Sequence, residues 1–346
     1  MKKWSTAVIC SCLGVFLLLG CFTALIDPFF LYHAPILDRG YLMGRYEEIY
    51  YSPGILRSFP YEAAIIGTSM AENSDPGDVE RLFGLKTVKA TMSAGQPADF
   101  RELMSLLHRG TKLVIRAVDM LSNVTAAPEV YRDEPRPGYL YNNNPFDDIE
   151  YLLGTDVLER SYETVKRARA GEYSTSLAAY ARWSDIYPIS KEEALKNYER
   201  PELADSTEPA DAYLANVREQ FERNIKPSLE GYPGTEFYMF NPPVSMLYWD
   251  RFTREGKADA LLDGYFELMR LCLEYDNVRF FWFDNRELTT DLENYRDQSH
   301  YGPEWNTWMF EQMRSGGYEI TSGSLEAVKA EFAAFVHGYD YESLFD

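Results

Sequence analysis

Basic residues are in short supply in this chain of 346 residues, which has 34 Lys and Arg against 54 Asp and Glu. The formal net charge is −20. A protein that holds nucleic acid through its phosphates needs a basic face, so we exclude nucleic acid as a partner. The sequence also lacks internal repeats and low-complexity stretches. With 46% hydrophobic residues, it can build a core.

Histidine and cysteine are scarce, at four residues each. The sequence has no His-Glu-x-x-His pair, no Cys/His zinc pattern, no phosphate loop and no Gly-x-Gly-x-x-Gly. We therefore expect no metal, nucleotide or other cofactor. Cys10, Cys12 and Cys21 lie near the N-terminus, which leaves Cys272 alone in the rest of the chain. This excludes an internal disulfide there, so the hydrophobic core must hold the fold.

Acidic residues are absent from the first 26 positions, and the twenty residues from Ala7 to Ile26 carry no charge of either sign. At 1.5 Å of helical rise per residue, this length matches a hydrocarbon core of about 30 Å. Lys2 and Lys3 precede the segment and add +2, so the rest of the chain carries −22. The asymmetry predicts one membrane-spanning helix with a cytoplasmic N-terminus and an extracellular body.

Three interpretations of this segment are open. A cleaved signal peptide has a shorter apolar centre and a small-x-small cleavage site, which is not evident here. The run LLGC, which ends at Cys21, resembles a bacterial lipobox, in which that cysteine becomes the lipidated N-terminus. A lipoprotein usually turns polar soon after its cysteine, whereas apolar sequence continues here to Ile26 and resumes at Pro28. We therefore favour an uncleaved signal anchor.

The body alternates short apolar runs with helical periodicity. Runs rich in β-branched and aromatic residues predict strands at Ala63–Gly67, Lys86–Ala90, Lys112–Val118, Glu236–Phe240 and Val278–Phe283. Apolar residues at three- and four-residue spacing predict helices at Asp78–Phe83, Ala98–His108, Ala212–Ile225, Lys257–Tyr275 and Glu304–Met313. This alternation predicts a three-layer α/β fold, with a parallel sheet of about five strands and helices on both faces.

The region 123–230 interrupts the alternation with loops and helices. We interpret it as an insertion between the third and fourth strands that caps the strand ends. The domain organisation we expect has three parts. Residues 1–27 form the cytoplasmic tip and anchor, residues 28–54 form a membrane-proximal linker, and residues 55–346 form the extracellular domain.

Polar residues follow the predicted strands, where ligands bind in an open parallel sheet. Ser69 comes directly after the first strand, and a late loop carries Asp297 and His300. A serine hydroxyl becomes a good nucleophile when an imidazole takes its proton, and the imidazole needs a carboxylate to orient it. We therefore predict Ser69, His300 and Asp297 as a catalytic triad, with Gly95 after the second strand as an oxyanion donor. The plainer interpretation of Gly-Thr-Ser is a turn with a helix N-cap.

The order of these residues resembles the SGNH (GDSL-like) hydrolase superfamily. The run IIGTSM around Ser69 resembles the first block of this superfamily, and DQSH at 297–300 resembles its last block, Asp-x-x-His. Gly95 lies where its second-block glycine is expected. The third block, Gly-x-Asn-Asp, is not recognisable, since Arg116-Ala-Val-Asp119 occupies its place. The oxyanion asparagine is therefore unassigned between Asn123 and Asn241. Tyr301, beside the histidine, is a candidate for substrate binding.

A subgroup fits better than the soluble esterases, because the anchor, the run GTSMAEN and the run SHYGPE resemble bacterial membrane-anchored members. These include the D-alanyl-lipoteichoic acid transfer protein and alginate O-acetylation proteins. The resemblance implies a flavodoxin-like sheet and a bacterial cell-membrane protein with an extracellular body. It also implies an esterase or acyltransferase that modifies an envelope polysaccharide or teichoic acid beside a membrane-bound O-acyltransferase.

Several functional alternatives stay open at this point. The acyl group can pass to water or to a sugar hydroxyl. An inactive relative that positions a polymer for a membrane-bound O-acyltransferase fits the missing third block, and a signal-anchored lipase is a weaker reading. The acidic body would repel a heavily anionic polymer, which favours a neutral or zwitterionic glycan as the substrate.

Overall fold

A six-stranded sheet forms the centre of the computed structural model, which describes residues 2–132 and 136–346. The strands are β1 (Ala63–Gly67), β2 (Thr87–Thr91), β3 (Leu113–Ala117), β4 (Glu236–Asn241), β5 (Val278–Trp282) and β6 (Glu319–Ile320). Their order across the sheet is β2-β1-β3-β4-β5-β6. The first five strands are parallel, in the order of flavodoxin-like doubly wound sheets, and β6 runs antiparallel to β5.

The five strands expected from the sequence are present, and each of their ends agrees with the expected residue or differs from it by one. The expectation of about five strands was wrong by one, because β6 adds a sixth at the edge of the sheet. It consists of two residues, with Ile320 paired to Phe280 and Glu319 paired to Phe281. A strand this short has no periodicity of its own and exists only through pairing with its neighbour.

The described part of the chain has sixteen α-helices. They are α1 (Lys2–Ile26), α2 (Glu48–Ser58), α3 (Ser69–Glu72), α4 (Pro76–Phe83), α5 (Pro97–Met104), α6 (Met120–Thr125), α7 (Asp148–Leu153), α8 (Thr155–Ala170), α9 (Lys191–Lys196), α10 (Asp211–Gln220), α11 (Lys226–Gly231), α12 (Met246–Arg254), α13 (Ala258–Cys272), α14 (Arg286–Thr290), α15 (Pro303–Ser315) and α16 (Leu325–Gly338). The five predicted helices correspond to α4, α5, α10, α13 and α15. A π-helical turn at Phe221–Ile225 carries α10 into α11.

Alternate side chains of the central strands meet helices on opposite faces of the sheet. Tyr238 of β4 lies edge-on to Phe83 of α4, with ring centroids 5.8 Å apart. Its neighbours Phe237 and Met239 line a small cavity together with Phe100 of α5 on the other face. The strands are therefore buried on both sides, which explains why they appear in the sequence as continuous apolar runs.

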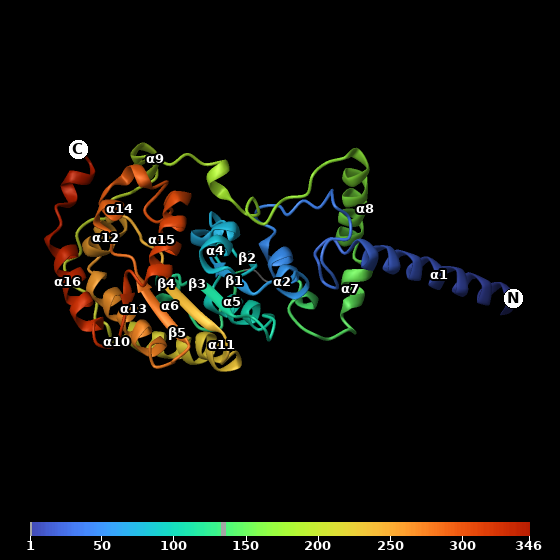
Figure 1. Ribbon diagram of the computed structural model, residues 1–346, viewed down its shortest axis with the longest axis horizontal. Coiled ribbons are helices and arrows are strands. Elements are labelled where there is room, and N and C mark those ends of the chain that lie inside the picture. Colours follow the sequence, from blue (N-terminus) through green and yellow to red (C-terminus); the bar gives the residue numbers. More distant parts are fainter. Residues whose placement is uncertain (1, 133–135) are drawn as a thin grey trace.

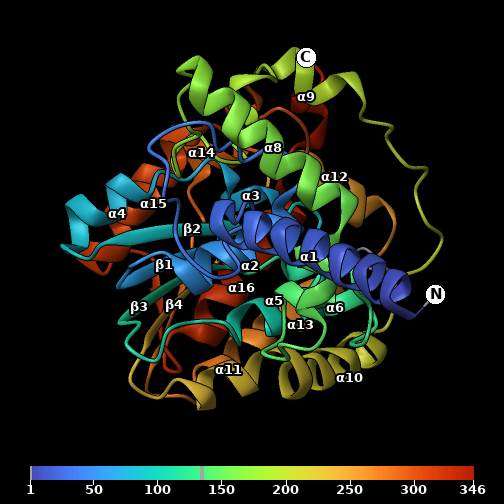
Figure 2. The same cartoon turned by 90° about the vertical axis from the view of Figure 1, so that its right-hand side faces the viewer.

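The helix α1 projects from one end of the molecule, and the C-terminus lies at the opposite end (Figure 1). Its described residues 3–26 are long and apolar enough to cross a membrane. Leu17 and Leu18 expose 68% and 72% of their surface, as expected for side chains that face lipid. The base of the helix contacts α7 and α8 (Figure 1), and Figure 2 shows the molecule from the side of α1.

Asp27 joins the end of α1 to the body. Its fully buried carboxylate accepts hydrogen bonds from the backbone N–H groups of Leu31, Tyr32 and His33 at 2.8–2.9 Å. The Tyr151 hydroxyl, at the end of α7, donates a fourth at 2.6 Å. Burial raises the pKa of Asp27, while the bonds from Tyr151, His33 and Tyr32 oppose this shift. The carboxylate thus connects α1, the following loop and α7.

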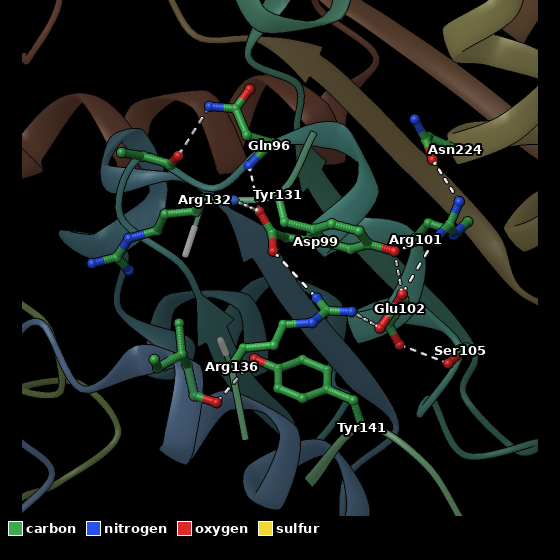
Figure 3. A network of polar contacts seen from close by, with 12 residues as sticks. Gln96, Asp99, Arg101, Glu102, Ser105, Tyr131, Arg132, Arg136, Tyr141 and Asn224 are labelled. Carbon is green, nitrogen blue, oxygen red and sulfur yellow. Dashed lines mark hydrogen bonds and ion pairs between the residues drawn. The ribbon is translucent and has the colours of Figure 1, made fainter. Parts of the chain in front are cut away.

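The region 118–235, between β3 and β4, holds helices α6 to α11 and no strand among its described residues. Ion pairs attach one part of it to α5 (Figure 3). Arg136 binds both Asp99 and Glu102, and Tyr131 donates to Glu102. The backbone N–H of Arg132 donates to Asp99 at 2.8 Å. These contacts hold a long crossover connection against α5.

The Asp27→Ala variant tests this junction. Three backbone N–H groups and one hydroxyl lose their acceptor inside the protein, so the free energy of unfolding should fall by about 3 kcal/mol. Urea unfolding of the full chain in detergent measures this change. The control is Asp38→Ala, whose side chain is 87% exposed and whose removal should change stability by less than about 0.5 kcal/mol. Equal effects of the two substitutions would contradict the role of Asp27.

Candidate active site

Ser69 lies at the carboxyl end of β1, where the chain turns directly into the short helix α3. Gly67 allows this turn. A Cβ atom at Gly67 would lie 2.7 Å from the Cβ of Ala71 and 2.8 Å from the Cβ of Ala117 on β3. Both distances are shorter than real Cβ contacts, so a larger residue would push α3 away from the sheet. As the first residue of α3, Ser69 also has a backbone N–H without an acceptor inside the helix.

The structure brings Ser69, His300 and Asp297 together in one chain of hydrogen bonds. Ser69 Oγ lies 2.8 Å from Nε2 of His300. On the other side of the ring, Nδ1 of His300 lies 2.8 Å and 2.9 Å from the two carboxylate oxygens of Asp297. In this order the imidazole can accept the serine proton while the carboxylate stabilises the resulting cation.

The loop 295–301 holds the histidine in place through its own backbone. Tyr295 and Tyr301 form an antiparallel bridge across the base of the loop. Inside it, Asp297 accepts hydrogen bonds from the backbone N–H groups of Ser299 and His300, both at 2.9 Å. Such a turn is typical of Asp, because its short side chain reaches N–H groups two and three residues ahead.

Two opposing effects act on the Asp297 carboxyl. Burial by itself raises its pKa, but the hydrogen bonds and positive charge of His300 outweigh this effect, with a smaller contribution from the Ser299 N–H. Together they lower the pKa of Asp297 to about 2. The carboxylate is therefore ionised throughout the neutral range and keeps Nδ1 of the ring protonated, which leaves Nε2 as the acceptor for Ser69.

Trp183, in the region 118–235, also contacts this group, although no pattern in the sequence points to it. Its indole N–H donates to the backbone carbonyl of Ser69 at 2.9 Å. Its ring lies edge-on to the imidazole of His300, with centroids 5.4 Å apart at 85°. The residue is separated from Ser69 by 114 positions, and no motif surrounds it, so only the folded chain reveals its position.

Two clefts meet at the His300 loop. Ser69 opens into a cleft of about 160 Å³, whereas the other side of the loop borders a wider cleft of about 530 Å³. Gln298, Ser299 and His300 line both. The remaining residues of the smaller cleft are Ser69, Met70, Asp119, Met120, Leu121, Asn241, Pro242, Val244, Tyr248 and Tyr265. The wider cleft is lined by Ala194, Asn197, Tyr198, Glu199, Pro201, Arg251, Glu255 and Asp297.

The four residues expected to bind an oxyanion or substrate lie in different places. Asn241 ends β4 and lines the cleft of Ser69. Gly95 does not line it, and its backbone N–H donates to the carbonyl of Met92 at 2.9 Å. Asn123 faces away, since its amide donates to the backbone of Asp119 and it borders another cavity.

Tyr301 is buried rather than available to a ligand, with 2% of its surface exposed. Its hydroxyl donates to the backbone carbonyl of Met70 at 3.2 Å. This bond connects the His300 loop to α3, so Tyr301 fixes the loop relative to Ser69. Among the four candidates, Asn241 is therefore the one whose side chain is left to line the cleft of Ser69.

Asp119 brings a carboxyl group into the same cleft, at the end of β3. Its side chain accepts from the backbone N–H of Ser122 at 3.3 Å. Burial raises the pKa of Asp119, an effect that the hydrogen bond to Ser122 and the charges of Arg116 and His300 oppose.

In the described residues, no group of three or more His, Cys, Asp or Glu side chains is arranged to hold a metal ion.

Comparisons with known proteins add little. No family model matches the sequence, and no curated protein matches it. The fold is similar to a solved structure provisionally described as a platelet activating factor from Streptococcus pneumonia, with a TM-score of 0.41 and 11% identity. The alignment covers 79% of this chain and 92% of that one. A likeness this distant carries no argument about activity or substrate.

The low pKa of Asp297 predicts a specific pH dependence of stability. Because the folded-state pKa lies below the ordinary 3.8, the ionised carboxylate stabilises the fold above that pH, and this contribution is lost toward about pH 2. Thermal unfolding of the wild type and of Asp297→Asn across this range should show a difference that shrinks with falling pH. A difference that grows toward low pH would contradict this assignment. The exposed Asp205→Asn is the control, with an expected change below about 0.5 kcal/mol.

Proposed function

We propose that this protein is a membrane-anchored, serine-dependent O-acyl esterase or acyltransferase of the SGNH type. The observation that carries the proposal is the 2.8 Å contact between Ser69 Oγ and Nε2 of His300, with Asp297 on the other ring nitrogen. This group lies in a cleft beyond the carboxyl ends of parallel strands, where α/β proteins of this type bind ligands.

In the proposed reaction, Ser69 Oγ attacks the ester carbonyl while its proton passes to Nε2 of His300. The tetrahedral intermediate then loses its alcohol, which takes the proton from His300 as the carbon–oxygen bond breaks. The acyl group stays on Ser69 until water or a sugar hydroxyl attacks it, with His300 again accepting and returning a proton. Asp297 stays ionised and orients the ring throughout.

Two groups are suited to bind the negative oxygen of the intermediate. The backbone N–H of Ser69 has no acceptor within α3, and the Asn241 side chain lines the same cleft. Asn241 thereby replaces Gly95 and Asn123 as the proposed donor, because the N–H of Gly95 and the amide of Asn123 are already bonded elsewhere.

The wider cleft supports transfer to a polymer as well as hydrolysis. With a volume of about 530 Å³ and His300 in its lining, it has room for a sugar residue beside the loop that carries the proposed base. The length and apolar character of α1 support attachment to the cell membrane, and Lys2 and Lys3 favour a cytoplasmic N-terminus with the body outside. We propose a neutral or zwitterionic envelope glycan or a teichoic acid as substrate, and a membrane-bound O-acyltransferase as partner.

One observation favours a second candidate function, in which the chain binds a polymer without turning it over. Asp119 lines the cleft of Ser69, and an ionised carboxylate there would oppose the negative charge of a tetrahedral intermediate. In that case the protein would position a glycan for a membrane-bound O-acyltransferase. Glycan binding would then be intact in Ser69→Ala, and the wild type would show no ester turnover.

The first test of the enzymatic function is Ser69→Ala, together with His300→Ala. Each variant should lower the rate of acetyl-ester hydrolysis by about 10³-fold or more, because nucleophile and base act as a unit. Ser69→Ala should also abolish covalent labelling by a fluorophosphonate. The control is Ser322→Ala, an exposed serine outside both clefts, which should match the wild type. Unchanged labelling in Ser69→Ala would overturn the proposal.

A second test concerns Asn241. Loss of one oxyanion donor lowers kcat by about 10²-fold, with little effect on KM, because the bond forms mainly in the transition state. Steady-state kinetics of Asn241→Ala should show this pattern. Asn123→Ala serves as the matched control, since its amide donates to Asp119 instead of facing the cleft of Ser69. A larger loss of kcat in Asn123→Ala than in Asn241→Ala would reverse the assignment.

A further inference from the structure

Apolar side chains are exposed next to the base of α1, although they belong to a segment more than a hundred residues further along the chain. Phe146, two residues before α7, exposes 88% of its surface, and Ile149 within α7 exposes 59%. Tyr151 points the opposite way, into the body, where its hydroxyl reaches Asp27. The helix α7 therefore has one face built into the protein and an apolar face with no protein over it.

The contact between α7 and α1 locates this face along the membrane-spanning helix. A Cβ atom on Gly20 would lie 3.8 Å from Leu152 and 3.9 Å from Leu153, so the end of α7 packs on α1 at that glycine. At 1.5 Å per residue, Trp4 lies roughly 24 Å from Gly20 along the helix axis, and Thr23 lies about 28 Å from Trp4. These lengths approach the hydrocarbon thickness of about 30 Å.

Trp4 is 74% exposed, and tryptophan is enriched at the membrane–water interface. If Trp4 marks the inner interface, the outer interface falls at the level of Gly20 to Thr23, where α7 contacts α1. We infer that Phe146 and Ile149 form a second membrane contact, which we name the α7 foot, and that it inserts into the outer leaflet beside α1. This inference rests on the membrane anchoring proposed above.

The charges around the α7 foot agree with insertion of its apolar face. Two acidic residues next to it turn toward the protein, since Asp147 accepts from the amide of Asn142 and Asp148 accepts from the Tyr32 hydroxyl. Glu150 is exposed on the flank of α7, where its carboxylate can stay at the headgroup level. Because the body carries −22, attraction to anionic lipid cannot supply the binding energy, and burial of apolar surface must do so.

The α7 foot also has a mechanical consequence. A single helix can tilt and rotate in a bilayer, whereas a helix with a second contact beside it holds the body in one orientation. Asp27 makes the connection stiff, because its four hydrogen bonds tie the end of α1, the loop that follows and Tyr151 of α7 together. The two clefts at His300 are thereby kept at a set height and direction above the membrane.

Fluorescence quenching in vesicles of phosphatidylcholine tests this inference on the full chain. Cys10, Cys12 and Cys21 are replaced by alanine, while Cys272 is fully buried and does not react with a label. Single cysteines then replace Phe146 or Ile149, each carrying an environment-sensitive fluorophore. The vesicles contain phosphatidylcholine that carries a nitroxide either near the headgroup or near the end of the acyl chain. The nitroxide near the headgroup should quench both labels more strongly than the one near the chain end.

Two further labels make the outcomes distinguishable. A variant that keeps Cys12 alone, within α1, should be quenched more strongly by the nitroxide near the end of the lipid chain. Leu203→Cys should be quenched by neither, since its side chain is 69% exposed and its segment joins α9 to α10, two helices that lie far from α1 in Figure 1.

If Cys12 is quenched while positions 146 and 149 behave like position 203, the anchor stands and the α7 foot is overturned. If Cys12 is not quenched either, the membrane anchoring itself fails, and the α7 foot fails with it.

Discussion

Parallel pairing of the strands is the constraint on which the candidate site depends. Parallel strands place all their carboxyl ends at one edge of the sheet, so Ser69 after β1 meets residues that follow β3, β4 and β5. The hydrogen bond between Ser69 and His300 spans 231 positions, yet it needs no special route, because both loops leave the same edge. Gly67 permits the close approach that brings Ser69 to this edge.

The rest of the site is added to this edge from outside the sheet. Trp183 comes from the long connection between β3 and β4, and its indole spans from the Ser69 carbonyl to the face of His300. That connection is itself held on α5 through Asp99 and Glu102. Long insertions are tolerated when contacts such as these offset the entropy of ordering them. The connection therefore shapes the cleft around groups that the sheet has already positioned.

The attachment of α1 to the body depends on one buried carboxylate, whereas the candidate site depends on the pairing of strands. A buried carboxylate is favourable only if its oxygens are hydrogen-bonded, and Asp27 meets this requirement with three backbone N–H groups and one hydroxyl. The same residue ends α1, with a left-handed backbone φ of 48°. The helix is consequently continuous with the folded body.

Local patterns in the sequence determine the apolar N-terminal segment, the five main strands, the strand end that carries Ser69 and the loop that carries Asp297 and His300. Each of these depends on residues within a few positions of one another, since a strand buried on both faces needs an apolar run and an Asp turn needs a fixed spacing. The tertiary structure alone decided the features that depend on contacts between distant segments. These include β6, which has only two residues, the position of Trp183, and the docking of α7 on Gly20. It also distinguished Asn241, which lines the cleft of Ser69, from Asn123, which does not. The direction of such a side chain depends on how neighbouring elements pack, and short-range periodicity in the sequence carries no information about that packing.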